Sequence, residues 1–526
     1  MRGVMLRQWR DWLAAGNRAE TLGRVGLLGF FLWFAGRHGH AYFGFTRFLQ
    51  MDAAALAQGR PEWRDLPLYT YDDTGGYDGH YYARIATDPF LREAATGEGM
   101  DNFAYRARRM LPGVVAHGLA GGEALSSIRY YAALNLVVWL VLAAVLWRLV
   151  PCGGARSLAL WAGLLFAAGT LHAVRCALPD LWAVALIALG FRAAEAGQGG
   201  RAGLWLALAG LSRETSLLAV AAVLPWMMGR HGWRAALTLG AVAVLPVVAW
   251  LAYIQMRLGG SGGGWDNFAL PFAGWVGKWR EVFAAVVSPD RHWLLAWGTL
   301  LGLVAMTVQA IYLIVGRDWR SPWWWLGLAY VGFMGVLNDG VWEGHPGAFA
   351  RVLLPLSLAF AVLAARRGAG WLWVAGGGAA VLGGLLTLAI VHHNPAEFGA
   401  GRLASGTYLA RIGPGFFGVE GQGRKAWAWC GGAGELDLAV WPRAAQPVAA
   451  VITLTARTRR MVSVSQDGRE LWRGEVGPQR VEVELAGLVW REGRVRLRVE
   501  SAAEPFREPG PQGRELSFAL AGVWLW

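Results

Sequence analysis

The chain has 526 residues, of which 55% are hydrophobic and only 16% are charged. Apolar blocks of roughly 15–25 residues recur from about residue 22 to residue 391, and this length, which crosses a hydrocarbon core, excludes an array of soluble domains. The net charge is +13, and nearly all of the positive residues are arginines. Pairs of these arginines occupy short loops between the blocks, which indicates membrane topology and argues against nucleic-acid binding.

The N-terminal segment is basic, and no small-residue cleavage site follows the first apolar block closely, so a retained anchor is expected. The three cysteines are far apart and fit no metal-ligand spacing. The apolar pattern predicts spans at about 24–45, 128–147, 158–174, 178–191, 203–212, 216–228, 237–256, 292–315, 322–338, 349–365 and 370–391.

Arginine-rich loops set the expected orientation of these spans. The pairs Arg148 with Arg156, Arg192 with Arg201, Arg230 with Arg234, Arg317 with Arg320, and Arg366 with Arg367 each occupy a short loop. If all of these loops and the N-terminus are cytoplasmic, residues 203–228 must enter and leave on one side, as a re-entrant helical hairpin. The prediction is about nine full crossings plus this hairpin, with a large first extracytoplasmic loop at 46–127.

The C-terminal part has a different sequence pattern. Residues 481–485 (VEVEL) and 495–500 (VRLRVE) alternate strictly, and residues 462–474 predict a hairpin that turns at Asp467-Gly468. About seven short strands between 416 and 526 indicate a compact, jelly-roll-like β-sandwich. The expected organisation is therefore a membrane domain at 1–395 and an extracytoplasmic β-sandwich at 396–526.

Ionisable residues in or near membrane spans are costly and are usually functional or paired. Four groups stand out: the first loop with Asp78 and its arginines, Arg175 with Asp180, Arg213 with Glu214, and the loop from Asp339 to Arg351. We expect the first, second and fourth groups to converge on the outer half of the membrane domain, and the third to reach toward it. A salt bridge between Arg175 and Asp180, and mutual neutralisation of Arg213 and Glu214, are the simpler interpretations of two groups. The candidates are Tyr77, Asp78, His80, Tyr81, Tyr82, Arg84, Asp101, Asn102, Tyr105, Arg106, Arg109, Arg175, Asp180, Arg213, Glu214, Asp339, Glu343, His345 and Arg351.

Arg106 and Arg109 are three residues apart and would share one face of a helix. Two guanidinium groups on one face suit a phosphate, because each donates paired hydrogen bonds and stays charged. A basic face at the lipid headgroups is the simpler interpretation. His345 beside two acids is a weak metal-ligand pattern, so no metal site is assigned, although a Mg²⁺ or Mn²⁺ ion is left open.

The segments GGYDGHYYARIATDP (75–89) and DNFAYRARRMLP (101–112) resemble the first-loop pattern of GT-C superfamily integral membrane glycosyltransferases. The ALPD turn (177–180) and LSRETSLL (211–218) resemble later helical segments of the same group. Asp78 lies farther beyond the first span than is usual in that superfamily, so Asp72 or Asp73 is an alternative carboxylate.

The resemblance implies an inverting transfer of a sugar from a polyprenyl-phosphate carrier to a glycan, lipid or protein acceptor. Asp78 would act as the base toward the acceptor hydroxyl, and the arginines would stabilise the leaving phosphate. It also implies a bacterial inner-membrane location with an extracytoplasmic C-terminal domain. A flippase or transporter, or a polymerase or ligase, for a lipid-linked glycan is the alternative function. A scaffolding protein without an active site is also open.

Overall fold

The structure is a computed structural model that describes residues 18–58, 61–71, 76–260, 263, 267–288, 293–421, 425–445, 447, 449–508 and 513–526. Asp72 and Asp73 lie outside these residues. The chain forms two compact units. The first comprises the chain up to His38 together with Phe45–Leu66 and Thr70–Val391; the second comprises Gly39–Gly44, Pro67–Tyr69 and His392–Trp526.

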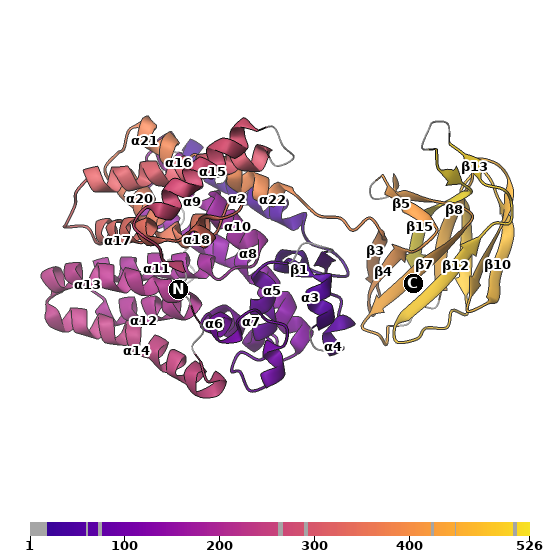
Figure 1. The fold of residues 1–526 in the computed structure, drawn as a ribbon, viewed down its shortest axis with the longest axis horizontal. Coiled ribbons are helices and arrows are strands. Elements are labelled where there is room, and N and C mark those ends of the chain that lie inside the picture. The colour runs from indigo at the N-terminus through magenta and orange to yellow at the C-terminus, as the bar shows by residue number, and fades with distance from the viewer. Residues whose placement is uncertain are drawn as a thin grey trace. The chain divides into compact units, whose positions relative to one another are not determined.

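The first unit is built from helices (Figure 1). Its longer helices follow the apolar blocks of the sequence. They are α2 (Arg18–Gly36), α8 (Ala124–Leu149), α9 (Ala155–Leu165), α10 (Ala168–Arg175), α11 (Asp180–Glu195), α12 (Gly199–Ser212), α13 (Leu217–His231), α14 (Trp233–Leu258), α15 (Ala273–Val287), α16 (Trp293–Val315), α17 (Pro322–Val336), α20 (Leu354–Arg366), α21 (Trp371–Gly377) and α22 (Val381–Ala389).

Four helical segments in the described part of the chain are long and apolar enough to cross a membrane. They are α8, α14, α16 and the stretch Trp371–Ala389, and a fifth is gained if α9 and α10, bent by 41°, count as one span. The predicted number of about nine crossings is therefore not confirmed, because other helices such as α11, α12 and α17 have 14 to 16 residues and fall short of this length. Two short helices, α12 and α13, do meet at the predicted tip near Arg213.

The first loop folds into short elements that carry the candidate residues. They are η1 (Thr46–Leu49), β1 (Met51–Asp52), α3 (Ala53–Gln58), α4 (Pro61–Arg64), β2 (Thr70–Tyr71), α5 (Gly79–Ile85), η2 (Ala94–Gly97), α6 (Phe103–Ala107) and α7 (Leu111–Leu119). β1 and β2 form a two-stranded parallel pair. The Asn102 side chain accepts a hydrogen bond from the Tyr105 backbone N–H (2.9 Å), which caps the start of α6.

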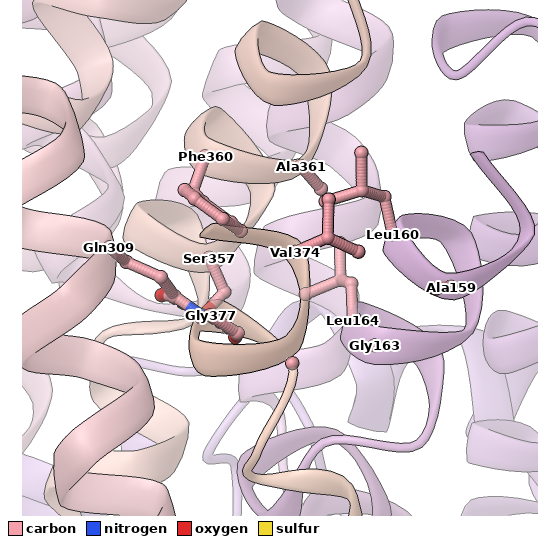
Figure 2. A pocket seen from close by; sticks show the side chains of 11 residues that line it. Ala159, Leu160, Gly163, Leu164, Gln309, Ser357, Phe360, Ala361, Val374 and Gly377 are labelled. Carbon is pink, nitrogen blue, oxygen red and sulfur yellow. Dashed lines mark hydrogen bonds between the residues drawn. The ribbon is translucent and has the colours of Figure 1, made fainter. Parts of the chain in front are cut away.

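Buried polar side chains fix how the helices pack. The Asn135 amide of α8 donates to the carbonyls of Ala173 (2.7 Å) and Leu178 (2.9 Å), and this holds the turn between α10 and α11. Deeper in the unit, Gln309 accepts from Ser357 (2.8 Å) and donates to the Gly377 carbonyl (2.7 Å), beside a cavity of only about 10 Å³ (Figure 2). That volume holds one water molecule at most, so the cavity is a packing feature and not a substrate site.

The second unit has two large antiparallel sheets (Figure 1). Their strand orders are β10-β9-β12-β7-β4-β3 and β11-β8-β15-β6-β5. The strands are β3 (Glu397–Leu403), β4 (Gly406–Ile412), β5 (Phe416–Glu420), β6 (Trp427–Cys430), β7 (Ala433–Trp441), β8 (Ala449–Thr455), β9 (Arg460–Gln466), β10 (Arg469–Val476), β11 (Val481–Ala486), β12 (Arg494–Glu500) and β15 (Phe518–Leu525). A separate small pair consists of β13 (Phe506–Arg507) and β14 (Glu515–Leu516).

The period-two alternation explains the core of this unit. On β12, Val495, Leu497 and Val499 are buried, whereas the alternating residues are exposed. Side chains from both sheets share one hydrophobic core, so the predicted C-terminal β-sheet domain is confirmed. The hairpin at Asp467-Gly468 is also confirmed, because β9 and β10 pair with Gln466 opposite Arg469. The sheets begin earlier than predicted, at Glu397, since the glycines of β3 and β4 obscure the alternation.

Candidate functional site

Two glycines place Asp78 at the start of α5. Gly76 has φ +72°, a left-handed conformation that costs glycine little, so the chain can turn just before Asp78. Gly79 has a different role: a Cβ at this position would lie 2.1 Å from the Cys176 carbonyl oxygen, so only glycine allows the loop to approach the end of α10. Asp78 occupies the N-cap position of α5, yet its carboxylate makes no capping hydrogen bond.

The Asp78 carboxylate instead lies between two guanidinium groups. Its Oδ1 is 2.9 Å from Arg106 Nη1, and its Oδ2 is 3.2 Å from Arg351 Nη2. Each of these arginines has a second carboxylate partner. Arg106 binds Asp101 through Nη2 (2.6 Å) and Nε (3.1 Å), and Arg351 binds Asp180 through Nη1 (3.1 Å).

The chain of ion pairs continues into the helices. Asp180, the first residue of α11, also pairs with Arg213 from the α12–α13 turn. Next along that turn, Glu214 forms a separate pair with Arg109 (3.2 Å), and the Tyr82 hydroxyl, which accepts from both Arg109 and Arg106, links this pair to the others. The ion-pair network, as we call it, comprises Asp78, Asp101, Asp180, Glu214, Arg106, Arg109, Arg213 and Arg351.

Two locally predicted pairs are wrong. Arg175 does not pair with Asp180: it donates to the Arg47 carbonyl (2.9 Å) and to the Tyr71 hydroxyl (3.1 Å). Arg213 and Glu214 do not neutralise each other, because each pairs with a residue distant in sequence. In both cases, residues close in sequence at helix ends contact different partners.

The ion-pair network is balanced in charge and graded in exposure. It contains four carboxylates and four guanidinium groups. The Asp180 side chain is 1% exposed, that of Asp78 is 22% exposed, and that of Asp101 is 48% exposed. The network therefore runs from a closed interior at Asp180 to solvent at Asp101, and Asp78 lies between them.

Aromatic rings line the same site. The Arg106 guanidinium lies 5.1 Å from the centre of the Tyr81 ring, and that of Arg109 lies 4.7 Å from the Tyr105 ring. Tyr77 lies beneath Arg351, with the guanidinium 5.7 Å from the ring centre. Such contacts hold the planar cations in place and shield them from water.

Opposing effects set the protonation of the loop residues. Burial acts to raise the pKa of Asp78, but the Arg351 and Arg106 guanidinium groups outweigh it and lower that pKa to about 2. Burial lowers the pKa of His80 to about 4, with a further contribution from Arg84. At neutral pH, Asp78 is therefore a carboxylate and the neighbouring imidazole is neutral.

Other sequence candidates lie outside the network. Arg84 donates to the Glu98 carbonyl and lies 5.0 Å from the centre of the Trp63 ring. Asp339 and Glu343 are exposed, and His345 contacts the Thr299 hydroxyl (3.0 Å). Within the described residues, no three His, Cys, Asp or Glu side chains gather as metal ligands would, so the Mg²⁺ or Mn²⁺ ion left open has no donor set there.

A cavity of about 470 Å³ opens beside the site. Its wall is mainly apolar and aromatic, and Met110 and Leu211 in that wall are sequence neighbours of Arg109 and Arg213. Trp250 and Tyr253 of α14 tie this wall to the first loop through hydrogen bonds to the Ala107 carbonyl (2.9 Å) and the Phe90 carbonyl (2.6 Å). The cavity and the ion-pair network are therefore built on the same segments of the chain, although no arginine of the network lines the cavity.

Two residues next to the site, His172 and Gly169, were not among the residues predicted from the sequence. The ring of His172 on α10 meets the Tyr77 ring edge-on, with 5.1 Å between the ring centres. Gly169 allows α10 to approach the segment that carries Arg351, since a Cβ there would lie 1.9 Å from the Ala350 carbonyl oxygen. One sequence feature indicates a functional helix end here. An apolar block ends with three polar or reactive side chains, those of His172, Arg175 and Cys176.

No protein-family model and no curated protein matches the chain. Among solved structures, the chain is similar to the arabinosyltransferase EmbB from Mycobacterium smegmatis, with 12% sequence identity and a TM-score of 0.24. The match covers 84% of this chain and 63% of that one, so the chain spans less than two thirds of the length of this structural neighbour. A similarity this distant gives no information about activity, so any inference about function rests on the chemistry of the site.

Proposed function

We propose that the protein is an inverting membrane glycosyltransferase that moves a sugar from a polyprenyl-phosphate carrier to a glycan, lipid or protein acceptor. The observation that carries the proposal is Asp78, a partly exposed carboxylate held between the Arg106 and Arg351 guanidinium groups. A base and a phosphate-binding cation then adjoin each other, as this reaction requires. The cavity lined by Met110 and Leu211 is the proposed place for the lipid chain.

The balanced charge of the ion-pair network decides where a donor phosphate binds. Every guanidinium in it already has a carboxylate partner, so a phosphate must replace one. Asp101 is the easiest to displace because its side chain is the most exposed of the four and its return to water costs least. Arg106, released from Asp101, is therefore the proposed partner of the donor phosphate.

Displacement of Asp101 would leave the charge around Asp78 nearly unchanged, because a donor phosphodiester carries one negative charge, as the Asp101 carboxylate does. A carboxylate with a pKa of about 2 is a weak base. In the proposed reaction, Asp78 therefore orients the acceptor hydroxyl and takes its proton only as the new bond forms.

In the proposed reaction, the acceptor oxygen attacks the anomeric carbon while its proton passes to Asp78. The bond from that carbon to the phosphate oxygen breaks, and the polyprenyl phosphate leaves with the bonding electron pair. Arg106 stabilises the charge that grows on the departing phosphate. A single displacement of this kind inverts the anomeric configuration. Tyr81 would cover the sugar, and the cavity near Met110 would hold the first isoprene units.

The location proposed for this chemistry is the extracytoplasmic face of a bacterial inner membrane, with the second unit on the same side. Positive charge in the short arginine loops supports this orientation. A reporter fused after residue 230 tests it, since a cytoplasmic signal is expected there and a periplasmic signal would contradict the hairpin at 203–228.

The direct test is a transfer assay in membranes with a panel of labelled polyprenyl-phosphate sugars, comparing the wild type with Asp78→Asn. Transfer should fall by roughly 10²–10⁴-fold. The variant should fold, because Arg106 and Arg351 keep Asp101 and Asp180 as partners. The matched control is Asp101→Asn, which also removes one network charge but retains the base. Unchanged transfer by Asp78→Asn would remove this residue from the mechanism.

The same assay separates the alternative functions. A flippase or transporter of a lipid-linked glycan would bind the carrier lipid but form no glycosidic bond with either variant. A polymerase or ligase would use only donors that carry a long glycan, whereas the proposed enzyme accepts a single sugar.

A further inference from the structure

A second charged cavity lies in the first unit, where α11, α13, α16 and α20 end and α17 begins. Its volume is about 730 Å³. Four arginines line it, Arg230, Arg320, Arg366 and Arg367, together with two acids, Glu195 and Asp318. None of these residues belongs to the ion-pair network.

Two of the four arginines already have partners. Arg366 makes a double contact with Glu195 (2.5 and 2.9 Å), and Arg367 pairs with Asp318 (3.1 Å) and donates to the Gly316 carbonyl (2.9 Å) at the end of α16. Four helices end here, and their C-termini carry partial negative charge, which the arginine side chains partly neutralise.

The other two arginines are surplus. Arg230 and Arg320 are exposed and line the cavity, and neither has an ion pair with a carboxylate among the residues that the structure describes. Among the side chains that line the cavity, four guanidinium groups face two carboxylates, and this excess of positive side chains favours an anionic occupant.

An independent observation comes from Ser321. This residue is the N-cap of the 15-residue helix α17, lines the cavity and is only 9% exposed. Its hydroxyl has no hydrogen-bond partner within the described part of the chain. A buried hydroxyl without a partner costs free energy unless a ligand or water satisfies it, and the positive end of the α17 dipole favours an anion there.

Tryptophans surround these groups and place them at a membrane surface. Trp226, Trp319 and Trp325 line the cavity, and Trp319 is 59% exposed. The Trp226 indole donates to the Arg320 carbonyl (2.8 Å), which fixes the loop that carries Arg320 and Ser321. Indole rings concentrate at the headgroup level of bilayers, where one edge is wet and the other apolar.

We propose that this cavity binds the phosphate group of an anionic phospholipid, with Arg230, Arg320 and the Ser321 hydroxyl as its ligands. The acyl chains would lie along the neighbouring exposed apolar surface, which includes Met228 (57% exposed). The site is separate from the proposed transfer reaction, and it places a specific lipid at the arginine-rich end of the helices.

The test is native mass spectrometry of the purified full-length protein after exchange into mixed micelles of phosphatidylglycerol and phosphatidylcholine. The wild type should retain phosphatidylglycerol selectively. The double variant Arg230→Gln with Arg320→Gln should weaken that retention about tenfold or more, because each arginine near an anionic lipid contributes on its own to the binding affinity. Ser321→Ala should weaken it by a smaller factor.

The control is Arg192→Gln with Arg201→Gln, which removes the same net charge from arginines that do not line the cavity. Equal retention of both lipids, or an equal loss in the control, would overturn the proposal.

Glycerol 3-phosphate is added in a second experiment as a soluble competitor. Failure to displace the lipid supports a lipid headgroup site, whereas displacement at equimolar concentration would overturn the lipid assignment. Thermal unfolding of each variant shows whether it has folded.

Discussion

The ion-pair network and the second cavity are both rich in arginine, but they differ in charge balance. In the network, four guanidinium groups meet four carboxylates, and Asp180 at its inner end is 1% exposed. In the cavity, four guanidinium groups meet two carboxylates, and Arg366, although paired, is 38% exposed. Burial explains the difference, because an unpaired charge is tolerated at the surface but not in the interior.

The comparison separates two uses of arginine. A balanced, buried network positions its members and changes only when a ligand displaces one of them. An unbalanced, exposed cavity has capacity for an added anion without any displacement. Mutations should therefore affect folding and catalysis in the network, and only lipid retention in the cavity.

The largest expected effect is that of Asp180→Ala. This change leaves Arg213 and Arg351 without their buried partner and should destabilise the first unit by about 3–5 kcal/mol. Thermal unfolding and the yield of folded protein in detergent measure the loss. A variant that unfolds at the wild-type temperature would show that the buried end of the network does not stabilise the fold.

Acidification should destabilise the folded protein through His80, next to the network. Its pKa is about 4 in the folded protein, below the ordinary value of 6.5, so the unfolded chain binds more protons between these values. The contribution is present above pH 6.5 and is lost as the pH falls toward 4, by up to about 3 kcal/mol. Unfolding temperatures measured from pH 7 to pH 4 should fall less steeply in His80→Gln. If the unfolding temperature fell equally steeply in both proteins, His80 would not contribute to the pH dependence of stability.

A smaller effect is expected at the exposed end of the network. Asp101→Asn removes the carboxylate that competes with the donor phosphate for Arg106, so the donor should bind more tightly, by up to about fivefold. Donor titration in the transfer assay measures the change in KM. Weaker donor binding would mean that Asp101 contributes to the donor site directly and is not displaced.

The smallest effect belongs to the second cavity. Asp318→Asn breaks an ion pair with Arg367 whose side chains are 27% and 34% exposed, and stability should change by less than about 1 kcal/mol. Phosphatidylglycerol retention should rise slightly, because one more arginine becomes uncompensated. A fall in retention would show that the cavity needs Arg367 to be held in place by its partner.

Local patterns predicted part of this structure, and long-range pairing accounts for most of the rest. Alternation in VRLRVE identified a strand and its buried face, because that period depends only on neighbouring residues. By contrast, Asp78 and Arg351 are 273 residues apart, and no local pattern states that they pair. Their juxtaposition depends on Gly79 and Gly169, two close approaches that the sequence does not specify.

Helix ends were also hard to predict. The apolar block at 158–174 appears continuous in sequence, yet the chain breaks between α9 and α10 at Phe166 and Ala167. The block at 370–391 divides at Gly378, between α21 and α22. Composition records only that these residues are apolar, whereas the bend depends on how neighbouring helices pack.

The second unit includes Gly39–Gly44 and Pro67–Tyr69, two stretches far from the C-terminal segment in sequence. Within that unit, His40 pairs with Glu397 (2.6 Å), and the Phe43 and Tyr69 rings meet edge-on with 5.4 Å between their centres. A chain cut at residue 391 would remove Glu397 from His40, Arg411 from the face of the Phe43 ring (5.7 Å from its centre) and the His392 carbonyl from the Tyr69 hydroxyl (3.2 Å). Such a truncation would leave residues of the second unit behind without these partners, so a cut at residue 391 does not separate the two units cleanly.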